Sequence, residues 1–144
     1  MTSEKIYISH SEAETRLIGS SFGENIKSGF TVLLYGDLGT GKTVFVKGVG
    51  DYFGISDSKV KSPSFTLINE YKTKSGIYLI HSDLYRLEDY SQVNLLGLED
   101  YVNSDDCILF VEWPERWKNI PDFNTVKIFF TALNENEREI KIQS

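Results

Sequence analysis

The chain has 144 residues, of which 40% are hydrophobic and 13% aromatic; this suffices for one globular domain with an ordinary core and excludes wholesale disorder. It carries 21 acidic against 15 basic residues, a formal net charge of −6. Such a chain has no bulk attraction for phosphate backbones, so we expect any contact with RNA to be made beside a protein partner.

Targeting and redox signals are sparse. No apolar run approaches the ~18 residues of a membrane-spanning helix, and residues 1–15 lack the basic-then-apolar pattern of a signal peptide. The single cysteine, Cys107, cannot form an internal disulfide. These features predict a cytoplasmic protein that does not enter a membrane.

The first part of the chain is predicted to form a short strand followed by an amphipathic helix. Residues 5–8 (KIYI) have the pattern of the strand. Ser9 and Ser11 are both candidates for the helix N-cap, because a glutamate follows each of them at the capping-box spacing. Apolar residues then recur at helical spacing as far as Ile26, and Gly29 is the expected stop.

The rest of the chain alternates strand and helix patterns and ends in a hairpin. We expect a strand covered on both faces at 30–35, a helix at 42–53 ended by Gly54, a hairpin of 66–71 and 77–83, short helices within 84–101, a buried strand at 107–112, and a closing hairpin of 125–130 and 138–142. This order predicts an α/β fold in which a single domain over residues 1–144 has a mixed central β-sheet flanked by helices.

The motif that carries chemistry is the glycine-rich loop GDLGTGKT at 36–43, which matches the phosphate-binding pattern G-x-x-x-x-G-K-[ST]. Glycines let successive backbone N–H groups point at phosphates, and the following helix adds the partial positive charge of its N-terminus. Lys42 is expected to reach the β- and γ-phosphates, and the Thr43 hydroxyl to take one position on Mg²⁺. The predicted nucleotide-binding residues are Asp37, Leu38, Gly39, Thr40, Gly41, Lys42, Thr43 and Val44.

Two predicted strands end in the carboxylates that such a site needs: Asp83 ends strand 77–83, and Glu112 ends strand 107–112. In an open α/β sheet, ligands bind outside the carboxyl ends of the strands, where the glycine-rich loop also lies. We therefore predict Lys42, Asp83 and Glu112 as catalytic residues. The same two acids and Thr43 are the predicted Mg²⁺ ligands, and the residues alone leave open which acid holds the metal and which positions water.

The segment SPSFT at 62–66 precedes the predicted hairpin. Pro63 favours an extended backbone, and the hydroxyls of Ser62, Ser64 and Thr66 are within reach of a γ-phosphate or its metal in a switch-like loop. From the residues alone, an ordinary loop leading into a strand is the simpler interpretation.

Four motifs in order resemble the TsaE family (YjeE/YdiB-type) of small bacterial P-loop ATPases. They are GDLGTGKT at 36–43, SPSFTLINEY at 62–71, HSDLYRL at 81–87 and VEWPER at 111–116. The resemblance implies a P-loop fold and an ATPase that binds ATP and Mg²⁺. It also implies two partner proteins, TsaB and TsaD, which transfer a threonylcarbamoyl group to adenosine 37 of tRNAs that read ANN codons.

By this resemblance, Lys42 and Thr43 bind phosphate and Mg²⁺, and SPSFT is the switch-like loop. Asp83 is implied as the Walker-B-type acid, and Glu112 as a metal-linked or catalytic acid. Trp113 is expected beside the nucleotide or at a partner surface, and Arg138 is a candidate nucleotide contact. The chain departs from the family pattern at three places, where Ser64, Ser82 and Val44 stand for the usual threonine, an aromatic residue and a second threonine.

Other residues have ordinary interpretations. His81 is expected as a packed or hydrogen-bonded histidine, His10 at a helix start, and Arg86 and Arg116 paired with nearby acids. Of Trp113 and Trp117, we expect one to pack in the core. A single cysteine and two separated histidines argue against a zinc site.

These observations predict a Mg²⁺-dependent ATPase that hydrolyses ATP slowly and resets a TsaB–TsaD complex. Slow turnover is expected because no arginine finger is evident in the chain. The alternatives are a small nucleoside or nucleotide kinase, which usually needs a lid bearing several arginines, and a binding module that responds to nucleotide without hydrolysing it. The preference for ATP over GTP rests on the family resemblance.

Overall fold

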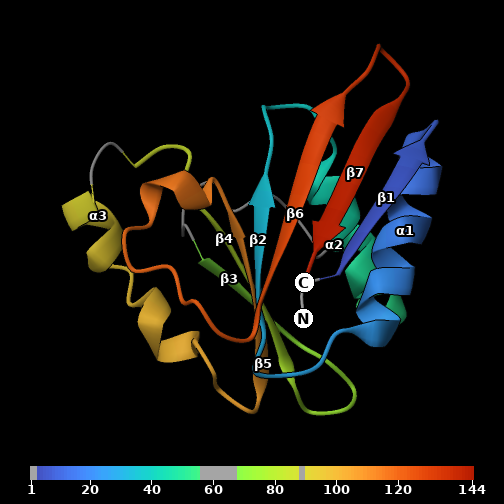
Figure 1. Ribbon diagram of the computed structural model, residues 1–144. Helices are drawn as coiled ribbons and strands as arrows, with labels where there is room; N and C mark the ends of the chain where they lie inside the picture. Colours follow the sequence, from blue (N-terminus) through green and yellow to red (C-terminus); the bar gives the residue numbers. More distant parts are fainter. Residues whose placement is uncertain (1–2, 56–67, 88–89) are drawn as a thin grey trace.

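A computed structural model describes residues 3–55, 68–87 and 90–144, which form a seven-stranded sheet with helices on both faces (Figure 1). The strands are β1 (Glu4–Ser9), β2 (Thr31–Tyr35), β3 (Ile68–Lys72), β4 (Tyr78–Asp83), β5 (Cys107–Glu112), β6 (Thr125–Ala132) and β7 (Arg138–Gln143). The helices are α1 (Glu12–Asn25), α2 (Lys42–Tyr52) and the short α3 (Tyr90–Asn94), with 3₁₀ turns η1 (Leu98–Tyr101) and η2 (Pro114–Arg116).

The sheet has the strand order β1-β7-β6-β2-β5-β4-β3. Strand β2 runs parallel to both β5 and β6, and β4 runs parallel to β5. The outer strands β1, β7 and β3 pair antiparallel with their neighbours. The predicted mixed sheet is therefore confirmed, and the carboxyl ends of its central parallel strands meet at one edge.

The central strands are mostly apolar up to their carboxyl ends because both of their faces are covered. Side chains alternate between the faces of a strand. In β2, Val32 and Leu34 therefore pack with Phe45 of α2 on one side, whereas Leu33 packs with Leu98 of η1 on the other. Figure 1 shows this division, with α1 and α2 on one side of the sheet and α3 on the other.

Helices α1 and α2 approach closely because each places a glycine at the contact. A Cβ built on Gly48 would lie 2.0 Å from the carbonyl oxygen of Arg16, and one built on Gly19 would lie 2.2 Å from that of Phe45. Larger residues would force the helices apart. The Arg16 guanidinium also binds both carboxylate oxygens of Asp51, at 2.5 and 2.8 Å.

The start of α1 resolves the two N-cap candidates. The Ser11 hydroxyl accepts a hydrogen bond from the Glu14 N–H at 3.1 Å, so Ser11 is the cap. Ser9 is buried instead, and its hydroxyl shares a 2.7 Å hydrogen bond with that of Thr15. Both serines therefore hold the junction between β1 and α1.

The predicted stop at Gly29 is wrong, because α1 already ends at Asn25. Ile26 donates its N–H to the Phe22 carbonyl but is itself extended, with ψ of 143°, which lets its side chain reach the core. The other predicted strand and helix boundaries coincide with the observed ones or differ by one or two residues, and residues 66 and 67 lie outside the described residues. Within the described ranges, no helix combines the length and apolar character that crossing a bilayer requires.

Candidate nucleotide-binding site

The glycine-rich loop connects the end of β2 to the start of α2, as the motif predicts. Gly41 precedes α2 in the left-handed conformation, with φ of 101°, and no side chain caps the helix. A residue with a side chain would be strained there. The first N–H groups of α2 are thus left for an anion, in the manner of phosphate-binding loops.

Lys42 is buried, with 4% of its surface exposed. Its Nζ donates a 2.6 Å hydrogen bond to the Gly36 carbonyl and lies 4.5 Å from the centre of the Trp113 ring. Burial lowers the pKa of the Lys42 amine, whereas the nearby charges of Glu112 and Asp83 oppose that shift. The amine is thus held inside the loop, next to where phosphates would lie.

The two predicted acids lie side by side. Strands β4 and β5 are parallel, and Asp83 is the direct partner of Glu112 in their register. The Thr43 hydroxyl donates to Oε2 of Glu112 at 3.3 Å, which links the acids to the start of α2. The sheet thereby brings together Lys42, Thr43, Asp83 and Glu112, as the positions of the strand ends predict.

Glu112 is almost completely buried but has a strong donor. His81 Nε2 lies 2.6 Å from Glu112 Oε2, and both side chains are nearly inaccessible. Burial by itself raises the pKa of Glu112, but the hydrogen bond from His81, the charge of Lys42 and the Thr43 hydroxyl outweigh it and hold the pKa below its ordinary value. Glu112 is therefore a carboxylate at neutral pH.

His81 was predicted only as a packed or hydrogen-bonded residue, and its contact with Glu112 is a link that sequence reasoning missed. It stands two residues before Asp83 and pairs with Phe110, two residues before Glu112. Residues two apart on a strand share a face, so this spacing is the signal that places the imidazole beside the acids.

Asp83 has a different environment from Glu112. Burial raises the pKa of Asp83, and the negative charge of Glu112 raises it further, against a backbone hydrogen bond from Tyr85. The Tyr85 N–H reaches Asp83 Oδ1 at 3.0 Å. The pKa of Asp83 is therefore raised, whereas that of Glu112 is lowered.

A cavity of about 410 Å³ lies over the loop. Its lining includes many of the predicted residues: Leu38, Gly39, Gly41, Lys42, Thr43, Val44, Asp83, Glu112 and Arg138. Asp37 and Thr40 do not line it; Thr40 is buried, and its hydroxyl donates to the Asp37 carbonyl at 2.7 Å, which stabilises the turn of the loop. The lining residues that sequence reasoning missed are Ser11, Glu12, Thr15, Glu135 and Asn136.

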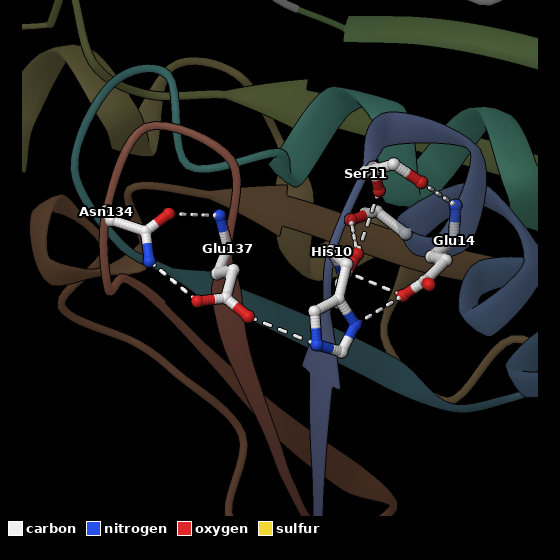
Figure 2. A network of polar contacts seen from close by, with 7 residues as sticks. His10, Ser11, Glu14, Asn134 and Glu137 are labelled. Carbon is white, nitrogen blue, oxygen red and sulfur yellow. Dashed lines mark hydrogen bonds and ion pairs between the residues drawn. The ribbon is translucent and has the colours of Figure 1, made fainter.

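The missed residues come from the start of α1 and from the β6–β7 hairpin. Figure 2 shows His10 between these two segments, with Nδ1 3.1 Å from Glu14 and Nε2 3.1 Å from Glu137. Arg138 of the hairpin donates to the Gly39 carbonyl at 3.3 Å and to the Asn134 carbonyl at 2.7 Å. These contacts join the hairpin to both α1 and the glycine-rich loop.

The two tryptophans have different surroundings. Trp113 has a left-handed backbone with φ of 58°, and its ring lies 4.9 Å from that of Tyr85 as well as over Lys42. Trp117 is the core residue, and its Nε1 donates to Glu99 at 3.1 Å. Trp113 thus lies beside the predicted nucleotide site.

The expected pairing of Arg116 with an acid is not found within the described ranges. Its guanidinium donates to the carbonyl oxygen of Leu87. This bond ties η2 to the segment after β4, so Arg116 fastens two loops that follow the acids.

The residues at the site suit a magnesium ion. Thr43, Asp83 and Glu112 offer the hydroxyl and carboxylate oxygens that Mg²⁺ prefers. The part of the chain that the structure describes contains no group of three or more His, Cys, Asp or Glu side chains able to hold a metal ion. Mg²⁺ usually keeps several waters and is held by one or two carboxylates together with substrate phosphates. The predicted switch-like residues Ser62, Ser64 and Thr66 lie outside the described residues.

Comparisons with known proteins relate the chain to one family. A family model described as threonylcarbamoyl adenosine biosynthesis protein TsaE matches residues 9–140. The tRNA threonylcarbamoyladenosine biosynthesis protein TsaE of Nostoc sp. is 40% identical over 141 residues, covering 96% of this chain and 84% of that protein. The protein of the same description from Aquifex aeolicus is 37% identical over 139 residues, covering 96% and 95%. A crystal structure of Bacillus subtilis YdiB covers 100% of this chain and 87% of its own, with a TM-score of 0.74 and 28% identity.

Proposed function

The chain belongs to the TsaE family of threonylcarbamoyl adenosine biosynthesis proteins, and we propose that it serves this pathway as a Mg²⁺-dependent ATPase. In this proposal it hydrolyses ATP slowly by itself and uses hydrolysis to reset a TsaB–TsaD partner complex. It meets tRNA only through that complex, as the net charge of −6 favours.

One observation carries the ATPase proposal: the loop lysine and threonine share a cavity with two adjacent strand-end acids. Lys42 would bind the β- and γ-phosphates, and the loop N–H groups would bind the others. Thr43 and one of the two acids would hold Mg²⁺, which supplies charge neutralisation at the phosphates. The acid not occupied by the metal would orient the attacking water.

The charges around the cavity support a requirement for Mg²⁺. Among the residues that the structure describes, four acids line it, namely Glu12, Asp83, Glu112 and Glu135, against two basic residues, Lys42 and Arg138. A nucleoside triphosphate, itself an anion, would meet net negative charge there. A divalent cation between the acids and the phosphates relieves that repulsion.

The contacts of Arg138 support a dependence on a partner. Arg138 is the arginine among the cavity-lining residues, and its guanidinium is already bonded to main-chain carbonyls of the hairpin and the loop. In P-loop enzymes an arginine that stabilises the transition state speeds hydrolysis by about 10³–10⁵. We therefore expect the TsaB–TsaD complex to complete or align the site.

The test is MgATP hydrolysis by the purified chain, alone and with the TsaB–TsaD pair from the same organism. We expect slow turnover alone and strong stimulation by the pair. Glu112→Ala should still bind nucleotide but lose hydrolysis and support of tRNA modification.

Other outcomes would overturn parts of the proposal. Unchanged hydrolysis, with no binding to the pair, would remove the partner assignment and leave the nucleotide site standing. Phosphoryl transfer to an added nucleoside would favour a kinase. Full support of modification by Glu112→Ala would favour a module that binds nucleotide without needing hydrolysis.

A further inference from the structure

We propose that His81 is a positioning residue that holds the Glu112 carboxylate in place for the magnesium–nucleotide complex. This inference rests on the proposed function, because it assigns Glu112 to the metal side of that site. His81 itself does not line the cavity, so it acts through Glu112 and not by touching nucleotide.

The geometry identifies the donor. A carboxyl group that serves on the metal side of the proposed site acts as a carboxylate, and a carboxylate can only accept hydrogen bonds. His81 Nε2, which lies 2.6 Å from Glu112 Oε2, must therefore carry the hydrogen. The hydrogen on Nε2 is thus assigned from the identity of its hydrogen-bond partner.

Both hydrogen bonds to Glu112 end on the same oxygen. His81 donates to Oε2 from one side, and the Thr43 hydroxyl donates to it at 3.3 Å from the other. Two donors on one oxygen fix the rotation of the carboxylate and leave Oε1 for a water or a metal ion. Thr43 is itself a predicted metal ligand. His81, Glu112 and Thr43 are therefore linked by hydrogen bonds that run from β4 through β5 to the start of α2.

The other ring nitrogen shows that stability alone does not explain a histidine here. His81 Nδ1 is buried and has no hydrogen-bond partner among the residues that the structure describes. A buried polar atom without a partner is unfavourable, and an apolar side chain of similar size would avoid it. The residue therefore costs stability at Nδ1 while it serves Glu112 at Nε2, as is usual at functional sites.

Two substitutions separate positioning from packing. His81→Met fills similar space without a donor, whereas His81→Gln can place an amide N–H near the position of Nε2. The readout is the affinity for ADP by calorimetry, with and without Mg²⁺, together with the melting temperature of each variant. The ratio of the two affinities measures what the metal contributes.

We expect His81→Met to melt below the parent, because the buried Glu112 carboxylate loses its closest donor, and to bind Mg²⁺-free ADP equally well. Its Mg²⁺-dependent gain in affinity should fall by about tenfold or more, the usual effect of losing a group that orients a metal ligand. His81→Gln should recover most of the gain. The inference is overturned if His81→Met keeps the full gain, or if His81→Gln loses as much as His81→Met at an unchanged melting temperature.

The affinity of the parent protein for ADP distinguishes failure of the proposed function from failure of the role of His81. A parent protein that binds no ADP with or without Mg²⁺ would refute the proposed function, whereas a parent that binds and a His81→Met variant that binds identically would refute only the role of His81. If His81→Met does not fold, nitrogen-15 NMR of the parent replaces it. We expect a protonated Nε2 whose signal moves when Mg²⁺ is added to the ADP complex; an Nε2 without hydrogen, or one indifferent to Mg²⁺, would overturn the inference.

Discussion

Lys42 illustrates how single residues prepare this site. Its amine is buried, yet it has a carbonyl acceptor at 2.6 Å and two acids close enough to favour its charge. The Gly36 carbonyl and the Trp113 ring hold it in the loop. The Lys42 amine is already removed from water in the folded protein, so binding a phosphate costs little further desolvation. This favours a charge-assisted hydrogen bond between the amine and the phosphate.

Replacing this lysine should weaken nucleotide binding strongly. A hydrogen bond to a charged group contributes about 1.5–3 kcal/mol, so Lys42→Met should lower the affinity for MgATP by about 10- to 100-fold. Lys47→Met is the matched control, since Lys47 lies on the same helix but does not line the cavity. Calorimetric titration of both variants measures this, and equal affinities would contradict the role of Lys42.

At the scale of elements, the pairing of α1 with α2 supports the loop from behind. Close glycine contacts set the distance between the helices, and the Arg16–Asp51 ion pair joins the first part of α1 to the last turn of α2. The hydrogen bond from Arg16 is the main reason that the pKa of Asp51 lies below its ordinary value. A lowered carboxyl pKa means that the ionised form is stabilised by folding.

The sign of this shift predicts a pH dependence. Because the pKa of Asp51 is lower in the folded state, its contribution is complete above the ordinary aspartate pKa of about 3.9 and is lost as the pH falls through the folded value. Asp51→Asn should therefore lower the free energy of unfolding at pH 7, by less than about 1 kcal/mol for such an exposed pair.

Urea unfolding at pH 7 and at pH 3 measures this difference between the parent and Asp51→Asn. The difference should shrink at pH 3. Asp122→Asn serves as the control, because it changes an exposed aspartate in the loop before β6. A difference that grows as the pH falls would contradict the expected sign.

At the scale of the whole molecule, the cavity is assembled from segments far apart in the sequence. The glycine-rich loop forms its floor, the strand ends supply the acids, and the start of α1 and the β6–β7 hairpin form further walls. His10 joins these two walls through Glu14 and Glu137, as Figure 2 shows. The shape of the site therefore depends on contacts between both ends of the chain.

Removing the contacts of His10 with Glu14 and Glu137 should weaken nucleotide binding modestly. Exposed ion pairs contribute up to about 1 kcal/mol, so His10→Ala should lower the affinity for MgATP by up to about fivefold. Lys5→Ala, on the exposed part of β1, should leave it unchanged. Calorimetry on both variants decides, and an affinity for His10→Ala equal to that of the parent would show that the hairpin needs no tie to α1.

Much of the fold was predictable because its signals are local. Apolar runs such as those of β2 and β5 identify strands covered on both faces, and the glycine-rich loop marks the junction of strand and helix. Asp83 and Glu112 were predictable as site residues because each ends such a strand. The end of α1 was missed, since the contact of Ile26 with the core overrides the glycine signal downstream.

The sequence by itself determined the residues of the candidate site: a glycine-rich loop of the phosphate-binding pattern, a lysine and threonine at fixed spacing, and two acids at strand ends. These depend on neighbours in the chain, so short-range rules of backbone geometry apply. Only the tertiary structure decided the strand order, the contact of His81 with Glu112, and the walls contributed by α1 and the hairpin. Those features arise from packing between distant segments. The spacing of His81 and Asp83 puts their side chains on one face of β4, but only the pairing of β4 with β5 brings His81 against Glu112.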